Sequence, residues 1–307
     1  MTVLARIFLL GAMALAALPA LGQDRSFLVD SEWLEQHVGD ENLVILETRY
    51  YPHRYFTVGH IPGAVQVQRF KDLGDNDSPS LMGFPSREAF QATLRSWGVN
   101  DDSTIVLYDD SNTALSSRVY FLLDLYGFDM SRVKLLDGGV LGWQDFNELS
   151  QDDVRPKPGT VTLADADPSM TVNWQFVYDR IVSRREARYT LLDARPERFY
   201  TGEELSHAVR GGHIPGAINI VSLSGTNPDA TWKSAEELAK IYADLPRDGT
   251  IIAYCHDGFR MSLAYMQLKS LGYRDVRLLD GGWGFWGNHH ALPIVTGFEP
   301  FDDNYKL

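Results

Sequence analysis

The chain has 307 residues, 44% of them hydrophobic, and a formal net charge of −13. At roughly 150 residues per domain, this length predicts about two globular domains, and the apolar content is sufficient for each to have its own core. The negative charge argues against nucleic acid or an anionic membrane surface as the main partner, so an anionic substrate would need a local positive site.

Residues 1–22 are typical of a secretory signal. Arg6 supplies the positive start, and residues 7–21 form an apolar run that is short for a membrane span, which takes about 20 apolar residues. The small residues before Gln23 fit a cleavage site. We therefore expect an exported, periplasmic protein with no membrane segment after cleavage. The alternative is an uncleaved anchor.

In chain order, the first half alternates short apolar strands with helical stretches. The patterns predict a strand at residues 43–48, a helix at 87–97, a strand at 104–108, a helix at 116–126 and a strand at 133–136. Residues 151–168 contain three prolines and several aspartates and predict an extended linker. The expected domains are thus residues 23–150 and 169–307.

The second half repeats the alternation. The patterns predict a helix at 173–184, a strand at 190–194, a helix at 234–242, a strand at 250–254, a helix at 261–269 and a strand at 276–279. Such alternation indicates an α/β fold in which helices cover both faces of a small parallel sheet. Ligands in these folds bind beyond the carboxyl ends of the strands.

Four motifs recur in the same order in both halves, which indicates an internal duplication. They are LETR at 46–49 with LDAR at 192–195, GHIPGA at 59–64 and 212–217, the apolar runs at 105–108 and 251–254, and DGG followed by tryptophan at 137–143 and 280–286. We interpret HIPG as a turn that enters a strand and DGG as a turn at a strand end. The pair His289 and His290 has no further ligand at metal-site spacing, so no metal is expected.

Cys255, the only cysteine of the chain, follows the predicted strand at 250–254. An exported protein with one cysteine has no internal disulfide, and an unpaired thiol there is a liability that a working role would explain. The alternative is a small core residue that ends a strand.

The loop after Cys255 consists of His256, Asp257, Gly258, Phe259 and Arg260, and Met261 follows it. A strand-turn-helix junction directs main-chain N–H groups and the positive end of the helix at the turn. We therefore expect these amides to form a collar around an easily ionised, nucleophilic thiol that opens on a cavity. Gly258 would permit the tight turn.

Together, the two GHIPGA motifs, the two DGG-x-x-x-W motifs and the single C-x-x-G-x-R loop resemble the rhodanese family in its tandem-domain form, the thiosulfate and 3-mercaptopyruvate sulfurtransferases. The resemblance covers nearly the whole mature chain. It implies two similar α/β domains of which only the second is catalytic. Asp109 stands where the second half has Cys255, so the first half is expected to be an inactive copy that walls the active cleft.

The resemblance also implies a two-step sulfur transfer without a cofactor. The Cys255 thiolate would take the outer sulfur of a donor such as thiosulfate, and a thiophilic acceptor, cyanide or a thiol, would then take it from the persulfide. Arg260 matches the family's loop arginine, Arg195 matches an arginine that binds the donor's anionic group, and Arg198 is a second candidate. The alternative for each arginine is a structural salt bridge. A reducing thiol protein is a further candidate partner.

The positions after Cys255 depart from both tandem subtypes. Thiosulfate-preferring members have two basic residues there, and mercaptopyruvate-preferring members have small ones, whereas this chain has His256 and Asp257. Asp257 would oppose an anionic donor, and His256 would help only when protonated. The resemblance therefore leaves 3-mercaptopyruvate as an alternative donor.

Two other functions are open from the sequence. One is a cysteine phosphatase, although such enzymes need five residues between Cys and Arg and this loop has four. The other is an exported sulfur carrier that accepts one sulfur and passes it on without turnover between small molecules.

Overall fold

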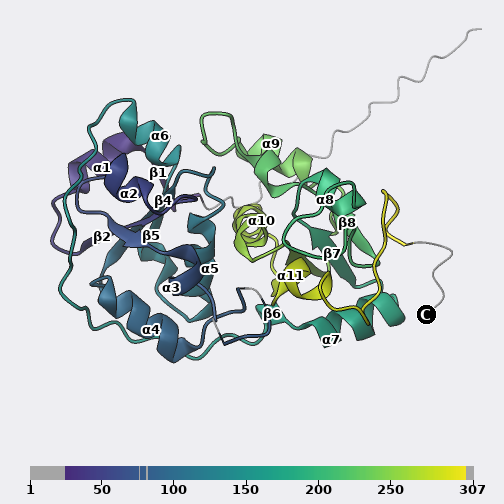
Figure 1. The fold of residues 1–307 in the computed structure, drawn as a ribbon. Helices are drawn as coiled ribbons and strands as arrows, with labels where there is room; N and C mark the ends of the chain where they lie inside the picture. Colours follow the sequence, from purple (N-terminus) through teal and green to yellow (C-terminus); the bar gives the residue numbers. More distant parts are fainter. Residues whose placement is uncertain (1–24, 76, 81, 302–307) are drawn as a thin grey trace, which may run out of the picture.

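Two five-stranded parallel sheets organise the part of the chain that the computed structural model describes, residues 25–75, 77–80 and 82–301. Each sheet belongs to one half of the chain, and the two halves lie side by side in Figure 1. The expected α/β class with two similar domains is therefore confirmed. The predicted signal at residues 1–22 lies outside the described residues.

The first sheet has the strand order β1-β5-β4-β2-β3. Its strands are β1 (Leu28–Val29), β2 (Leu43–Thr48), β3 (Val65–Val67), β4 (Thr104–Asp109) and β5 (Val133–Leu136). Its helices are α1 (Ser31–His37), α2 (Arg54–Thr57), α3 (Arg69–Asp72), α4 (Arg87–Ser96), α5 (Ser116–Leu125) and α6 (Gly139–Gln144). The three predicted strands and two predicted helices are all present, whereas the short strands β1 and β3 were not predicted.

The second sheet repeats this arrangement with the order β6-β10-β9-β7-β8. Its strands are β6 (Thr171–Val172), β7 (Tyr189–Asp193), β8 (Ala217–Asn219), β9 (Thr250–Tyr254) and β10 (Val276–Leu279). Its helices are α7 (Trp174–Val177), α8 (Glu197–Thr201), α9 (Ala235–Ile241), α10 (Phe259–Ser270) and α11 (Gly282–Trp286). The predicted helix at 173–184 is divided, because α7 continues as a π-helical segment, Tyr178–Ser183.

The strand β9 shows why these elements form. All of its residues are buried, since helices cover both faces of the sheet, and such strands need continuous apolar runs rather than alternation. The chain then turns at Gly258, where φ is 97°, and enters α10. The sheet and this turn together place Cys255 at the carboxyl end of a central strand.

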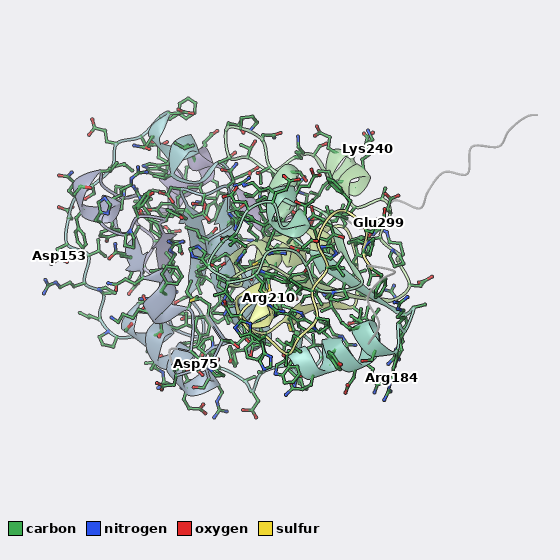
Figure 2. All side chains as sticks on the ribbon, turned by 45° about the vertical axis from the view of Figure 1, so that its right-hand side comes forward. Asp75, Asp153, Arg184, Arg210, Lys240 and Glu299 are labelled. Carbon is green, nitrogen blue, oxygen red and sulfur yellow. The ribbon has the colours of Figure 1, made fainter. Side chains whose placement is uncertain are left out.

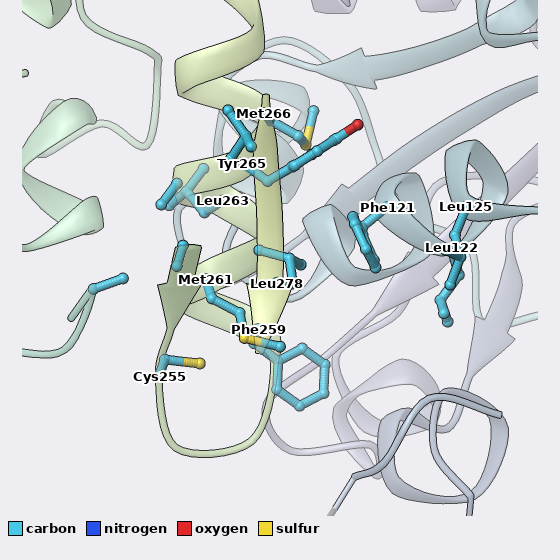
Figure 3. Packing of buried hydrophobic residues seen from close by; sticks show 14 of the residues in the cluster. Phe121, Leu122, Leu125, Cys255, Phe259, Met261, Leu263, Tyr265, Met266 and Leu278 are labelled. Carbon is cyan, nitrogen blue, oxygen red and sulfur yellow. The ribbon is translucent and has the colours of Figure 1, made fainter. Parts of the chain in front are cut away.

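The two domains share one hydrophobic core through α5 and α10, which lie next to each other between the sheets in Figure 1. The rings of Phe121 and Tyr265 meet edge to face with centroids 5.0 Å apart, and the Tyr265 hydroxyl donates to Asp124 at 2.7 Å. Figure 3 shows these two helices and the side chains between them. The helix that follows Cys255 is therefore held by the other half of the chain.

The segment that joins the halves carries no helix or strand at residues 151–167, yet it is bound to the first domain. The amide of Val161 donates to the carbonyl of Val99 at 3.1 Å, and the amide of Ala164 donates to the carbonyl of Tyr126 at 3.0 Å. Val161 and Leu163 are buried. No helix among the described residues is long and apolar enough to cross a membrane.

The second half contains a longer loop at residues 203–210, which Arg210 anchors. Its guanidinium donates to four carbonyls, those of Trp286, Gly287, His289 and Leu292, at 2.6–3.0 Å. Arg210 is labelled in Figure 2. The anchored loop supplies Ser206 and His207 to the candidate site described below.

Both HIPG segments are turns that enter strands β3 and β8, as predicted. In each, the histidine stacks on a tyrosine, with ring centroids 3.8 Å apart for His60 on Tyr55 and for His213 on Tyr200. The ring nitrogens of His213 lie 2.9 and 3.1 Å from the carbonyl oxygens of Tyr200 and Glu299. Burial lowers the pKa of His213, so the ring is neutral and can donate to only one of them.

We predict that His213→Ala lowers the free energy of unfolding by about 2 kcal/mol, because it removes a stacked ring and a buried hydrogen bond. Urea unfolding followed by tryptophan fluorescence measures the change. The control is His290→Ala, an exposed position at which the change should stay within about 0.5 kcal/mol. If the two variants had equal free energies of unfolding, the stacking of His213 on Tyr200 would contribute nothing to stability.

Candidate active site

Cys255 lies inside the loop that connects β9 to α10. Figure 3 shows its side chain within the curve of this loop, directed to the side where Met261 and Phe259 lie. The amide of Gly258 donates to Sγ at 3.2 Å, and the amides of Asp257 and Met261 also favour the thiolate form. The predicted collar of main-chain amides is therefore present.

Gly258 is required by conformation and by space. Its φ of 97° lies in the region that side chains disfavour. A Cβ at this position would lie 2.6 Å from Nη1 of Arg118, a residue of the first domain. Glycine at this position thus permits both the turn around the sulfur and the close approach of Arg118 from the first domain.

The resting thiol does not ionise more easily than an ordinary cysteine, and this corrects the sequence-based expectation. Burial raises the pKa of Cys255, and the Asp257 carboxylate raises it further. The amides of Met261 and Asp257 and the charge of Arg260 lower the pKa without reversing the shift. The sequence pattern revealed the amides, but the cost of removing the sulfur from water depends on its burial.

The first half shows what a loop at this position in the fold can bind. The carboxylate of Asp109 accepts hydrogen bonds from the amides of Ser111, Thr113, Leu115 and Ser116 at 2.8–2.9 Å, and from the Ser116 hydroxyl at 3.0 Å. Burial raises the pKa of Asp109 while these bonds lower it. The duplicated loop therefore wraps main-chain donors around a buried acidic group.

A cavity of about 530 Å³ lies between the domains next to both loops. From the first domain it is lined by Tyr50, Arg69, Phe70, Ser111, Asn112, Ala114 and Leu115. From the second it is lined by Arg198, Phe199, Ser206, His207, Leu223, His256, Asp257, Phe259 and Arg260. Four residues of the Cys255 loop thus face the cavity, and the first half does wall it.

The sulfur itself does not reach this cavity. Cys255 is fully buried and is absent from the lining, so the expectation that the thiol opens on a cavity is wrong for this conformation. His256 and Phe259 of the lining are themselves nearly buried. A donor must displace part of the loop lining before it can touch Sγ.

Two of the three arginines predicted to bind substrate line the cavity. Arg260 stands in the first turn of α10, and its Nε is buried without a hydrogen-bond partner among the described residues. Arg198 is more exposed and forms an ion pair with Glu204 at 2.6 Å. Arg260 is therefore the better placed cation for an anionic group beside the loop.

Arg195 lies outside the lining, in a buried ion pair. It donates to both oxygens of Asp193 at 2.6–3.0 Å and to the Gly212 carbonyl at 2.7 Å. Arg49 pairs in the same way with Glu47 and Gly59 in the first half. This repetition indicates a structural strut, so donor binding by Arg195 stays a prediction. Burial opposes the positive charge of Arg195, but the charges of Asp193 and Cys255 favour it and raise the pKa of Arg195.

His256 is neutral at neutral pH. Its Nε2 lies 2.7 Å from the carbonyl oxygen of Ser206. Burial and the nearby Arg195 lower the pKa of His256 to about 4. The help that a protonated His256 would give to an anionic donor is therefore absent near pH 7.

Arg118 is a site residue that the sequence reasoning missed. This fully buried side chain of α5 donates to the carbonyls of Leu73 and Met82, and its Nη1, the atom next to Gly258, has no partner among the described residues. Burial lowers the pKa of Arg118 to about 10, and Asp280 and Cys255 oppose the shift. The only signal in the sequence was a single charge in an otherwise uncharged stretch at residues 111–123.

No group of three His, Cys, Asp or Glu side chains suited to a metal ion occurs in the described part of the chain. The site therefore consists of a thiol, main-chain amides and arginines. These groups are suited to holding anions and to nucleophilic attack by sulfur.

Comparison with known proteins agrees with this geometry. The sulfur carrier protein TtuD of Thermus thermophilus is 34% identical over 284 residues, with 89% of this chain and 97% of that protein covered. The thiosulfate sulfurtransferase of Corynebacterium glutamicum is 32% identical over 280 residues, with 88% and 90% covered. The crystal structure of the 3-mercaptopyruvate sulfotransferase SseA from Escherichia coli matches with a TM-score of 0.73 and 29% identity, covering 84% of this chain and 98% of that one.

The model of the rhodanese-like domain matches the chain twice, at residues 30–146 and 178–289. The two matches fall on the two sheets, and the second contains the Cys255 loop. The chain belongs to the rhodanese family and contains two rhodanese-like domains.

Proposed function

We propose that this protein is a sulfurtransferase that carries a sulfane sulfur on Cys255 as a persulfide, with thiosulfate as donor and cyanide or a thiol as acceptor. The observation that carries the proposal is the amide collar closed on Sγ. The matching loop around Asp109 supports it, because that loop already surrounds an acidic group with main-chain donors. Relatives named as thiosulfate and 3-mercaptopyruvate sulfurtransferases support the same chemistry.

In the first step, the Cys255 thiol loses its proton to solvent and the thiolate attacks the outer sulfur of thiosulfate. A bond forms between Sγ and that sulfur, the sulfur–sulfur bond of thiosulfate breaks, and its electron pair leaves with sulfite. The negative charge then rests on the outer persulfide sulfur. Main-chain N–H groups at the start of α10 stabilise this charge, and Arg260 attracts the departing anion.

In the second step, the acceptor attacks the outer sulfur and the Sγ–S bond breaks toward Sγ. With cyanide the products are thiocyanate and the Cys255 thiolate. Because the two half-reactions share one intermediate, the kinetics should be ping-pong. Burial of Cys255 implies that the loop moves before each half-reaction.

A sulfur carrier without turnover is the second candidate. The full burial of Cys255 favours it, since a hidden sulfur is slow to exchange with small molecules, and one relative is named a sulfur carrier protein. A carrier would accept one equivalent of labile sulfur and show negligible steady-state transfer. Export to the periplasm, inferred from residues 1–22, remains part of the proposal and is tested by locating the processed chain in cell fractions.

We predict that Cys255→Ser lowers thiocyanate formation from thiosulfate and cyanide by at least about 10³-fold, because the hydroxyl is a poor nucleophile here. Intact mass spectrometry should show that the native chain gains one sulfur atom and the variant gains none. Circular dichroism should show an unchanged fold. Activity retained in the variant would contradict the assignment, and turnover of an aryl phosphate without any sulfur transfer would favour a phosphatase.

Asp257→Asn should move the rising limb of the pH profile of kcat/KM for thiosulfate to lower pH. The Asp257 carboxylate raises the pKa of Cys255, so its loss lowers the pH at which the reactive thiolate forms. Thiolate absorbance in the ultraviolet reports the same shift directly. As control, Asp153→Asn changes an exposed aspartate paired with Arg155, away from the loop, and should leave the limb in place. An unmoved limb in Asp257→Asn would refute the electrostatic account.

Arg118→Gln should move the same limb to higher pH and slow sulfur loading severalfold. The variant removes a cation that attracts the Cys255 thiolate and supports the turn at Gly258. Arg118→Lys keeps the positive charge. Its pH profile should therefore lie closer to that of the native protein than the profile of Arg118→Gln does, even if its free energy of unfolding stays below the native value. If Arg118→Gln only lowered the yield or stability of folded protein and left the pH profile unchanged, Arg118 would be structural alone.

A further inference from the structure

Arg69 begins α3 in the inactive half, yet it lines the same cavity as the Cys255 loop. Its guanidinium carbon lies 4.3 Å from the ring centroid of Tyr50 and 4.4 Å from that of Phe70. Its Nε is buried without a hydrogen-bond partner, and Arg69 forms no ion pair with any described residue. A cation is thus held in place by aromatic rings while its hydrogen-bonding edge stays free.

A guanidinium held in this way is suited to a planar anion. Ring contacts attract the cation and fix its plane, and the in-plane N–H groups match a carboxylate in a two-pronged pair. Arg260 also lines the cavity and likewise has an unpartnered buried Nε. Each domain therefore contributes one such arginine.

The cavity is too large for the smallest substrates of the proposed reaction. Its volume of about 530 Å³ lies in the range of roughly 300–1,000 Å³ that holds organic ligands. Thiosulfate or cyanide would leave most of it empty. The rings of Phe70 and Phe259 meet edge to face with centroids 6.4 Å apart, so an apolar surface runs from Arg69 to the Cys255 loop. The expected occupant has an anionic end and an aliphatic part.

We propose that Arg69, with Tyr50 and Phe70, forms an acceptor subsite for small thiols that bear a carboxylate. The carboxylate binds Arg69, the aliphatic part contacts Phe70 and Phe259, and the thiol reaches the outer sulfur on Cys255 once the loop has moved. Arg260 stays with the anionic donor group beside the loop. This inference rests on the persulfide of the proposed function and names the class of acceptor.

The transfer balances without a further reagent. The acceptor sulfur forms a bond with the outer persulfide sulfur, and the bond from that sulfur to Sγ breaks with its electron pair on Sγ. The proton of the acceptor thiol passes to Sγ. The products are the Cys255 thiol and the acceptor as a persulfide anion, so nothing is oxidised or reduced overall.

The test separates the two half-reactions. The protein is loaded with thiosulfate, freed of excess donor and checked for one added sulfur by intact mass. Single-turnover discharge is then measured with mercaptosuccinate, which carries carboxylates, and with 2-mercaptoethanol, which carries none. The native protein should prefer mercaptosuccinate, and the ratio of the two second-order rate constants should fall about tenfold or more in Arg69→Gln. Arg69→Lys should recover part of the preference.

The matched control is Arg54→Gln. Arg54 also lies over a tyrosine, with its guanidinium carbon 5.1 Å from the ring centroid of Tyr51, but it is absent from the cavity lining. This variant should keep the native ratio. The use of a ratio removes general effects of a substitution on loading or folding.

Three results would overturn the inference. If sulfur loads but the ratio is the same in the native protein and Arg69→Gln, the acceptor subsite is wrong while the persulfide stands. If Arg69→Gln weakens only loading from 3-mercaptopyruvate, the subsite serves a carboxylate-bearing donor instead. If no sulfur loads from any donor, the proposed function itself fails.

Discussion

The structure depends on a sulfur atom being kept out of water where main-chain amides converge at the end of β9. Removal from water opposes a negative charge on Cys255, and the amides of the collar favour it. The fold builds the same arrangement twice, and in the first half the amides surround the carboxylate of Asp109. Both halves thus hold a buried acidic group at this position, a carboxylate in the first and a thiol in the second.

The first half contributes more than a wall of the cavity. Through α5 it packs against α10, the helix that begins within the Cys255 loop, so both loops are fixed by a common core. Arg118 presses on the glycine of the turn, and Arg69 reaches the cavity from the same domain. The sulfur and the charges nearest to it belong to the second half, and the first half adds Arg118 at the turn and Arg69 at the cavity.

Much of the fold could be predicted from the sequence. Strands β2, β5, β9 and β10 have the expected bounds, because strands covered by helices on both faces are rich in apolar residues. The edge strands β1, β3, β6 and β8 were missed because two or three residues carry no periodic signal. Cys255 was found from local spacing. Arg118 and Arg69 were not, since the approach of Arg118 to Gly258 and the cavity that Arg69 lines exist only when the two halves pack together. The direction of the Cys255 pKa shift was also misjudged, since it depends on burial that no motif encodes.

The concealment of Cys255 has a consequence for the lifetime of the protein. Irreversible oxidation of a thiol begins with exposure of its thiolate to an oxidant. The Cys255 sulfur is fully buried and burial raises its pKa, and both features protect it from this damage. The loop that surrounds Cys255 therefore also shields the sulfur from oxidants.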